Sequence, residues 1–143
     1  MIDPFQHIDS IFALRSVDVA TVNRTLGVQL TKERENPYWV FYEAAANDQF
    51  ERLNFNLSRD GIRWLLAWDY RSDVAPYEHD VDLKRFGVVK DIQMNPGIMP
   101  EGTVTYEFQR ANIKVLVEIL ATSRRLKGAA LHKELGDAQP GYL

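Results

Sequence analysis

Apolar residues near the start of the chain recur every three or four positions, the spacing of one face of an α-helix. Asp3-Pro4 supplies a capping carboxylate and a proline suited to the first helical turn. Ser16 is the expected cap of a second helix, and Gly27 stands where a helix end takes a left-handed residue. The pattern predicts two short helices, with apolar faces formed by Phe5, Ile8, Ile11 and Phe12 and by Val19, Val22 and Leu26.

Farther along the chain, apolar and polar residues alternate, which is typical of strands with one buried face. The strand that ends at Tyr70 is the most apolar, so we expect it in the centre of a sheet. Asp60-Gly61 just before it predicts a hairpin turn. Two charged or proline- and glycine-rich stretches, 31–37 and 93–102, are expected to be loops. The alternation predicts strands at 38–42, 52–57, 62–70, 104–108, 113–119 and 126–132.

The order of these elements occurs twice, each time as a short helix that ends on a glycine and is followed by a loop and a meander of strands. Residues 16–70 and 80–133 are possible repeat units, although a chance recurrence of helix and meander would give the same pattern. We expect a single α+β domain over 1–135, in which an antiparallel β-sheet carries two N-terminal helices and a short central helix on one face. Residues 136–143 are expected to form a flexible tail.

The composition narrows the class of protein. The chain has 143 residues, 45% of them hydrophobic, which suffices for one domain with a core. A net charge of −3 disfavours nucleic-acid binding, and the basic run Arg124-Arg125-Leu126-Lys127 is expected to be only a turn. The absence of cysteine excludes disulfides and thiolate zinc sites. Without a signal-peptide pattern or an apolar run of about 20 residues, we expect a cytoplasmic protein that does not enter the membrane.

No residue pattern predicts catalysis, a metal site or a cofactor, so we expect no enzyme. His79 lies among carboxylates in Glu78-His79-Asp80, but neighbouring residues diverge and no His-Glu-x-x-His spacing exists. The simpler interpretation is a solvated loop in which Asp80 caps the following helix. His7 and His132 stand alone and are expected at the surface or its boundary. Neither a Gly-x-Ser-x-Gly motif nor a glycine-rich phosphate loop is present.

The stretch from 68 to 82 combines aromatic side chains with carboxylates and is the strongest candidate site. Trp68 and Tyr70 share one strand face with Trp64, where they would pack in the core, or else they emerge at the strand end as interface anchors. The carboxylates either keep a loop solvated or form a negative surface that attracts a basic partner. On the second interpretation, the partner-binding residues are Trp68, Asp69, Tyr70, Asp73, Tyr77, Glu78, Asp80 and Asp82.

The helices that end at Leu26-Gly27 and Phe86-Gly87, each followed by tyrosine-containing strands, resemble the tandem modules of β-lactamase-inhibitor-like and small outer-membrane-lipoprotein-like folds. The chain lacks a lipoprotein signal, which departs from the envelope versions of that fold. Its acidic, cysteine-free, aromatic-rich character over about 17–132 also resembles small bacterial immunity proteins that neutralise toxins of contact-dependent or type VI secretion systems. This resemblance implies an inhibitor that occludes a cognate toxin with a basic surface, and it carries over no binding residue.

Three alternatives stay open. A small-molecule-binding module or enzyme of cone-like α+β type would line a pocket with the aromatic sheet face and turn His79 or Tyr106 inward. A secretion chaperone or adaptor would expose a larger apolar patch. A homodimer could form through the edges of the sheet.

Overall fold

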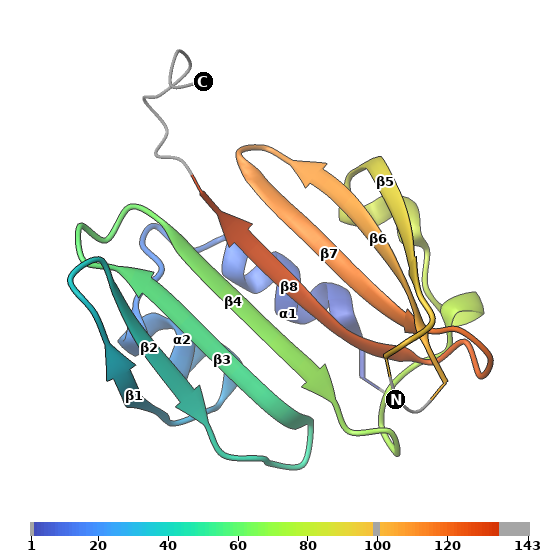
Figure 1. The fold of residues 1–143 in the computed structure, drawn as a ribbon, viewed down its shortest axis with the longest axis horizontal. Helices are drawn as coiled ribbons and strands as arrows, with labels where there is room; N and C mark the ends of the chain where they lie inside the picture. The colour runs from blue at the N-terminus through green and yellow to red at the C-terminus, as the bar shows by residue number, and fades with distance from the viewer. Residues whose placement is uncertain (1, 99–100, 135–143) are drawn as a thin grey trace.

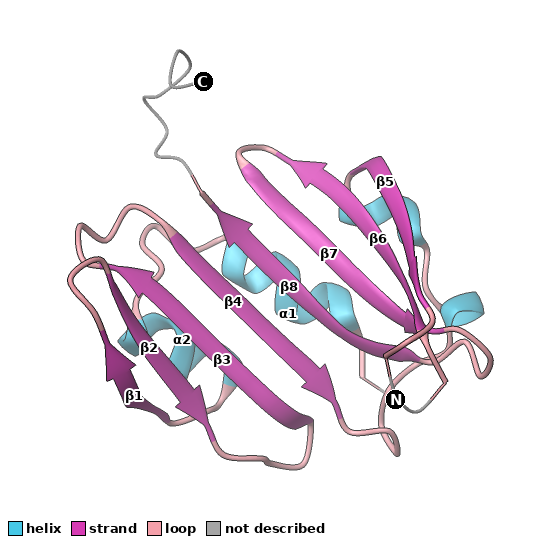
Figure 2. Ribbon diagram, viewed as in Figure 1, coloured by secondary structure: helices cyan, strands magenta, loops and turns pink. Residues whose placement is uncertain are grey.

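The computed structural model describes residues 2–98 and 101–134 and contains one antiparallel sheet with its helices against one face (Figure 1). This arrangement confirms the α+β class, and Figure 2 shows that the described chain has more strand than helix. The eight strands lie in the order β1-β2-β3-β4-β8-β7-β6-β5. The expected tail at 136–143 lies outside the described residues. The elements are α1 (Pro4–Phe12), α2 (Val19–Leu26), β1 (Leu30–Glu35), β2 (Trp39–Ala44), β3 (Phe50–Ser58), β4 (Trp64–Tyr70), β5 (Val88–Asn95), β6 (Thr103–Arg110), β7 (Ile113–Leu120) and β8 (Leu126–Lys133).

Both N-terminal helices form where the apolar spacing places them. The carboxylate of Asp3 caps α1 by accepting from the backbone N–H of Phe5 at 3.0 Å. The cap of α2 is Asp18 rather than Ser16, because Asp18 and Thr21 exchange side-chain and backbone hydrogen bonds in a capping box. The helix ends at Gly27, whose φ of 66° is left-handed. No helix in the described part of the chain is long and apolar enough to cross a membrane.

The sheet consists of two four-stranded meanders that meet where β4 pairs with β8. Strands β1–β4 form one half and β5–β8 the other, so each expected unit, 16–70 and 80–133, contains one half. Each meander has one strand more than the sequence pattern predicts. Whether the halves share an origin stays a hypothesis.

In place of the expected central helix, the structure has two short 3-10 turns. Glu78–Asp80 and Leu83–Phe86 form the single 3-10 turns η1 and η2. Asp82, and not Asp80, caps the second turn, because its carboxylate accepts from the N–H of Lys84 at 3.2 Å. The turn delivers Phe86 to the core, where its ring lies 4.5 Å from that of Phe5.

The two strands that the sequence pattern missed are the two edges of the sheet. The segment expected as a charged loop at 31–37 overlaps β1 at 30–35, and β5 covers 88–95, which overlaps the loop expected from residue 93. Almost every residue of both strands is exposed. An edge strand beyond the cover of the helices has no buried face, so it has no alternation to detect.

Helix α1 bridges the two halves of the sheet, lying behind β4 and β8 in Figure 1. The ring of His7 in α1 contacts Trp68 of β4, and the two ring centroids are 6.2 Å apart. Phe5, also in α1, contacts Phe86 of the second half. Asp9 completes the bridge by pairing with Arg110 of β6 at 2.6 Å. The core therefore lies between the helices and one face of the sheet. The opposite face, called here the open face, carries no helix from residues 2–98 or 101–134.

Candidate functional site

The aromatic anchors expected at the partner surface lie in the core. Trp68 and Tyr70 are 2% and 3% exposed, and both face the helices. Their rings pack against Phe50 and His7. This correction follows from the period of the strand, because Trp68 and Tyr70 share a side with Trp64 and Leu66, which α1 covers.

The carboxylates of the 68–82 stretch are mostly engaged within the molecule. Asp69 pairs with Lys127 at 3.1 Å, and Asp73 pairs with Arg71 at 3.2 Å. Glu78 pairs with Arg124. The remaining two contact the chain next to them, Asp80 lying 3.5 Å from His79 and Asp82 capping η2. The short basic run at 124–127 therefore balances the acidic stretch, and the surface is a mixed one.

Arg125 fixes the position of the remaining candidate, Tyr77. Its guanidinium lies 4.4 Å from the centre of the Tyr77 ring and donates to the Tyr77 hydroxyl at 3.0 Å. The same guanidinium donates to the backbone carbonyls of Ser72 and Ala75. The basic run thus starts a strand and also holds the acidic loop against β8.

The three histidines lie in separate parts of the described structure. His79 has a side chain that is 76% exposed and stacks on Tyr77. His132 is half-buried at the end of β8, where burial lowers its pKa. The described residues contain no group of three or more His, Asp or Glu arranged to hold a metal ion. Tyr106, the other residue considered for a pocket, stacks on Phe108 against the core.

His7 was expected at the surface or its boundary, and the structure partly encloses it among aromatic rings. Its ring is surrounded by Phe50, Trp68 and Tyr70, and its Nε2 lies 3.0 Å from the amide oxygen of Gln49. Burial lowers the pKa of His7 below 6.5, although the Gln49 hydrogen bond acts in the opposite direction.

Acid should therefore destabilise the fold through His7. The unfolded chain takes up the proton near pH 6.5 and the folded chain only at lower pH, so stability is complete above about 6.5 and falls as pH drops through the folded pKa. We expect His7→Gln to reduce the loss of stability between about pH 7.5 and pH 5 in urea unfolding. The exposed His79→Gln should leave that loss in place. An identical pH dependence in His7→Gln and wild type would contradict this assignment.

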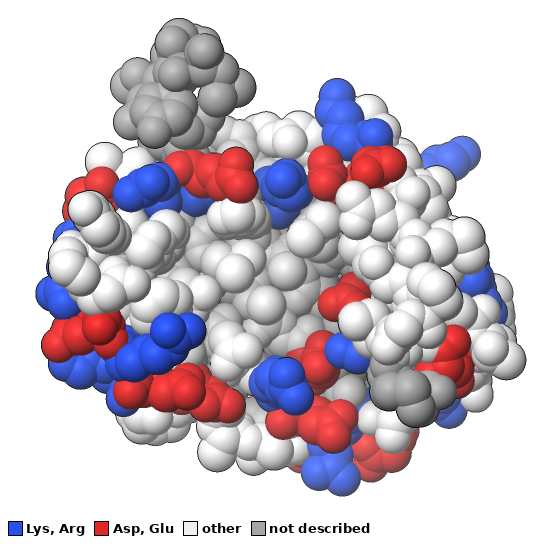
Figure 3. All heavy atoms as spheres, viewed as in Figure 1, with Lys and Arg blue, Asp and Glu red and all other residues white. Residues whose placement is uncertain are grey.

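The open face has an apolar centre, which is unusual for a sheet face in contact with water. Asn54, Ala67, Ala130 and Leu116 lie opposite one another in one line across β3, β4, β8 and β7. All are half-buried, as is Leu65 beside them. We call these five residues the floor. Figure 3 looks onto the open face and shows a mostly uncharged hollow with Lys, Arg, Asp and Glu along its rim.

Two aromatic residues of β2 stand on the open face beside the floor, and each lies against an arginine. The guanidinium of Arg34 is 4.1 Å from the centre of the Phe41 ring, and that of Arg63 is 5.4 Å from the Trp39 ring. Register places both on the open face, because Trp39 lies opposite Ser58 and Phe41 opposite Asn56. We call Trp39 and Phe41 the aromatic wall.

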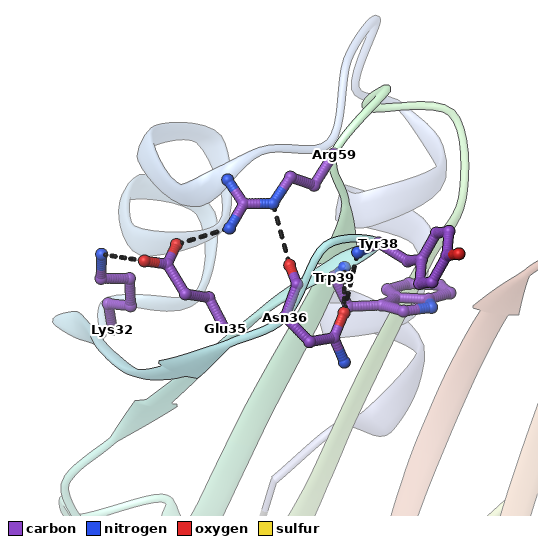
Figure 4. Close-up of polar contacts among 6 residues, drawn as sticks. All are labelled: Lys32, Glu35, Asn36, Tyr38, Trp39 and Arg59. Carbon is purple, nitrogen blue, oxygen red and sulfur yellow. Dashed lines mark hydrogen bonds and ion pairs between the residues drawn. The ribbon is translucent and has the colours of Figure 1, made fainter.

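The turn between β1 and β2 holds this wall in place (Figure 4). The side-chain oxygen of Asn36 accepts from the backbone N–H groups of Tyr38 and Trp39, both at 2.8 Å. Arg59 ties the turn down by donating to the Asn36 carbonyl at 3.0 Å and to Glu35 at 2.8 Å. Hydrogen bonds from Lys32 and Arg59 lower the pKa of Glu35. These bonds therefore fix the backbone that carries Trp39.

A pocket of about 460 Å³ lies at the end of the open face next to the acidic stretch. Charged side chains from β3, β4 and β8 line it, namely Arg52, Asp69 and Lys127, together with Leu120 of β7 and Ile98 of the β5–β6 loop. Of the residues predicted from sequence, Asp69 lies on the open face. The sequence pattern singled out neither the floor nor the aromatic wall, although the two-sided apolar character of β2 was a signal for the wall.

A scan against models of known protein families gave no match, and searches of curated proteins and of solved structures gave none either.

Proposed function

We propose that the protein is a protein-binding inhibitor that holds a segment of another protein against its open face. The observation that carries this proposal is the mostly apolar floor beside the Trp39 and Phe41 wall. Tryptophan, tyrosine and arginine are the residues enriched at the energetic centres of protein interfaces. The charged rim would orient a partner, and the floor and wall would supply the desolvated contact.

The floor favours a partner that approaches closely. Ala67 and Ala130 face each other in the middle of the sheet, so the backbone of the sheet is accessible there. A partner helix or strand with a projecting apolar side chain would fill the hollow without displacing large side chains. Because Arg34, Asn36 and Arg59 already fix the wall, little side-chain entropy is lost on binding.

The specific role we propose is that of an immunity protein, which neutralises a bacterial toxin by covering its active site. The mixed charges at the end of the open face, including Asp69, Arg52 and Lys127, would pair with charges on the toxin. Such a protein acts in the cytoplasm and needs no cofactor or catalytic group.

Co-expression with a toxin domain encoded beside the gene tests this role. We expect the chain to restore growth and to co-purify with the toxin. Ala67→Arg places a long cation on the floor and should weaken binding by at least about thirtyfold, the loss typical of a hot spot. The matched control is Ala20→Arg, which makes the same change on an exposed position of α2 on the other face.

The possible outcomes test the immunity role and the binding surface separately. Failure to protect against any neighbouring toxin would reject the immunity role. Protection and binding that persist in Ala67→Arg would reject the open face as the binding surface. If binding instead decreased in a variant with Asp73→Asn and Glu78→Gln, the acidic loop would be the contact, as the sequence pattern predicts.

A further inference from the structure

The two outer strands of the sheet occupy equivalent positions but differ in chemistry. Each is the outer strand of a four-stranded meander, and each contains an irregularity in register, at Lys32/Arg34 in β1 and at Val89/Asp91 in β5. Beyond Leu30, β1 exposes only Thr31-Lys32-Glu33-Arg34-Glu35, the kind of charged edge that prevents strand pairing. Strand β5 instead exposes apolar side chains, with Val88, Val89, Ile92 and Met94 between 48% and 73% accessible.

The irregularity in β5 brings two of these apolar residues to the same side. Val89 lies opposite Phe108 and Ile92 opposite Tyr106, and both of those residues pack against the core. Residues three apart in a regular strand point to opposite faces, but the extra residue at Lys90 changes that relation. Val89 and Ile92 therefore both lie on the helix-bearing side, on either side of the pair Lys90-Asp91.

This order of residues is complementary to itself in an antiparallel pairing. We propose that β5 pairs with β5 of a second copy of this chain, with Lys90 opposite Asp91 of the second copy and Asp91 opposite its Lys90. In that register Val89 lies opposite Ile92 of the second copy, and Val88 lies opposite Gln93. Each opposed pair lies on one side of the sheet, since Val88 and Gln93 both belong to the open face.

A second copy would also place a cation next to a like-charged pair. Asp91 lies directly opposite Glu107 of β6, a like-charged pair that is unfavourable across two strands. Asp91 accepts from the N–H of Ile92 and from Gln93, and neither carboxylate forms an ion pair within 2–98 and 101–134. Lys90 of the second copy would place a cation beside Asp91.

The twofold axis of this dimer passes between Lys90 and Asp91 and runs perpendicular to the sheet. The two sheets become one continuous sheet whose open faces lie on the same side. The dimer does not depend on the proposed inhibitor function, because β5 is the edge farthest from the aromatic wall.

Sedimentation equilibrium tests the dimer and its register. Wild type should pass from monomer to dimer between about 10 µM and about 1 mM. Lys90→Asp and Asp91→Lys each create two like-charged pairs and should raise the dimer dissociation constant at least about tenfold. The double variant exchanges the two charges and should dimerise as wild type does. An equimolar mixture of the single variants should form a heterodimer, because every charge then meets its opposite.

Glu33→Lys is the matched control at the other edge and should leave the dissociation constant unchanged. Far-UV circular dichroism of each variant checks that the fold is intact. A wild type that stays monomeric at about 1 mM would overturn the proposal. So would a dimer indifferent to the single charge changes, or one that Glu33→Lys disrupts, since either result would place the contact elsewhere.

Discussion

Replacing Gly128 by alanine is expected to lower the free energy of unfolding by about 3 kcal/mol. Gly128 lies at the junction of the two halves, opposite Asp69 of β4 and Glu118 of β7. A Cβ at this position would overlap the backbone carbonyl oxygen of Trp68 and would come within 3.0 Å of the Asp69 Cα. Backbone atoms cannot move aside as a side chain can, so the pairing of β4 with β8 would have to open.

Gly97→Ala is the matched control for this effect. Gly97 lies in the loop after β5, and an added Cβ would have no neighbouring atom within 4 Å. We expect a change within about 0.5 kcal/mol in urea unfolding, as for other unconstrained surface positions. Equal effects of the two substitutions would show that the close approach of β4 and β8 does not limit stability.

Trp68→Ala is expected to cost about 4 kcal/mol of stability, the range for removing a large aromatic side chain from a core. The indole is buried among Phe50, Tyr70 and His7. Its loss would leave a cavity between α1 and the centre of the sheet. Chemical denaturation with near-UV circular dichroism measures both the stability and the packing of the remaining aromatic rings.

Trp68→Phe separates packing from hydrogen bonding at the same position. It keeps a ring in the cluster next to Phe50 and Tyr70 and removes the buried indole N–H. We therefore expect a cost well below that of alanine, about 1 kcal/mol. A partner-binding role for Trp68 predicts the reverse, with stability retained and affinity lost in Trp68→Ala.

The sequence pattern predicted the strands that have one buried face and one more exposed face. In β4 and β7 every second residue is buried beneath the helices, so alternation marks both. In β1 and β5 almost every residue is exposed, and local sequence carries no period. Their strand character depends on pairing with β2 and β6, which is a tertiary property.

The candidate site was harder to predict, because its determinants are distant in the sequence. Two carboxylates of the acidic stretch are neutralised by distant cations. Glu78 pairs with Arg124, 46 residues away, and Asp69 pairs with Lys127, 58 residues away. In β2, both Trp39 and Phe41 on one side and Val40 and Tyr42 on the other are apolar. Which pair faces solvent depends on where the helices pack, and pattern alone does not determine that.

The bridge that α1 forms has a consequence for the order in which the chain folds. During synthesis the first half is complete once β4 has emerged. At that stage β4, the most apolar strand, is an unpaired edge of the unfinished sheet. Its neighbour β8 and the Asp9 partner Arg110 emerge some 60 and 40 residues later. Helix α1, made first, can dock fully only after the last strand arrives. The nascent chain therefore carries an unpaired hydrophobic strand while about 60 further residues are made, and a chaperone would have its greatest effect on yield in that interval.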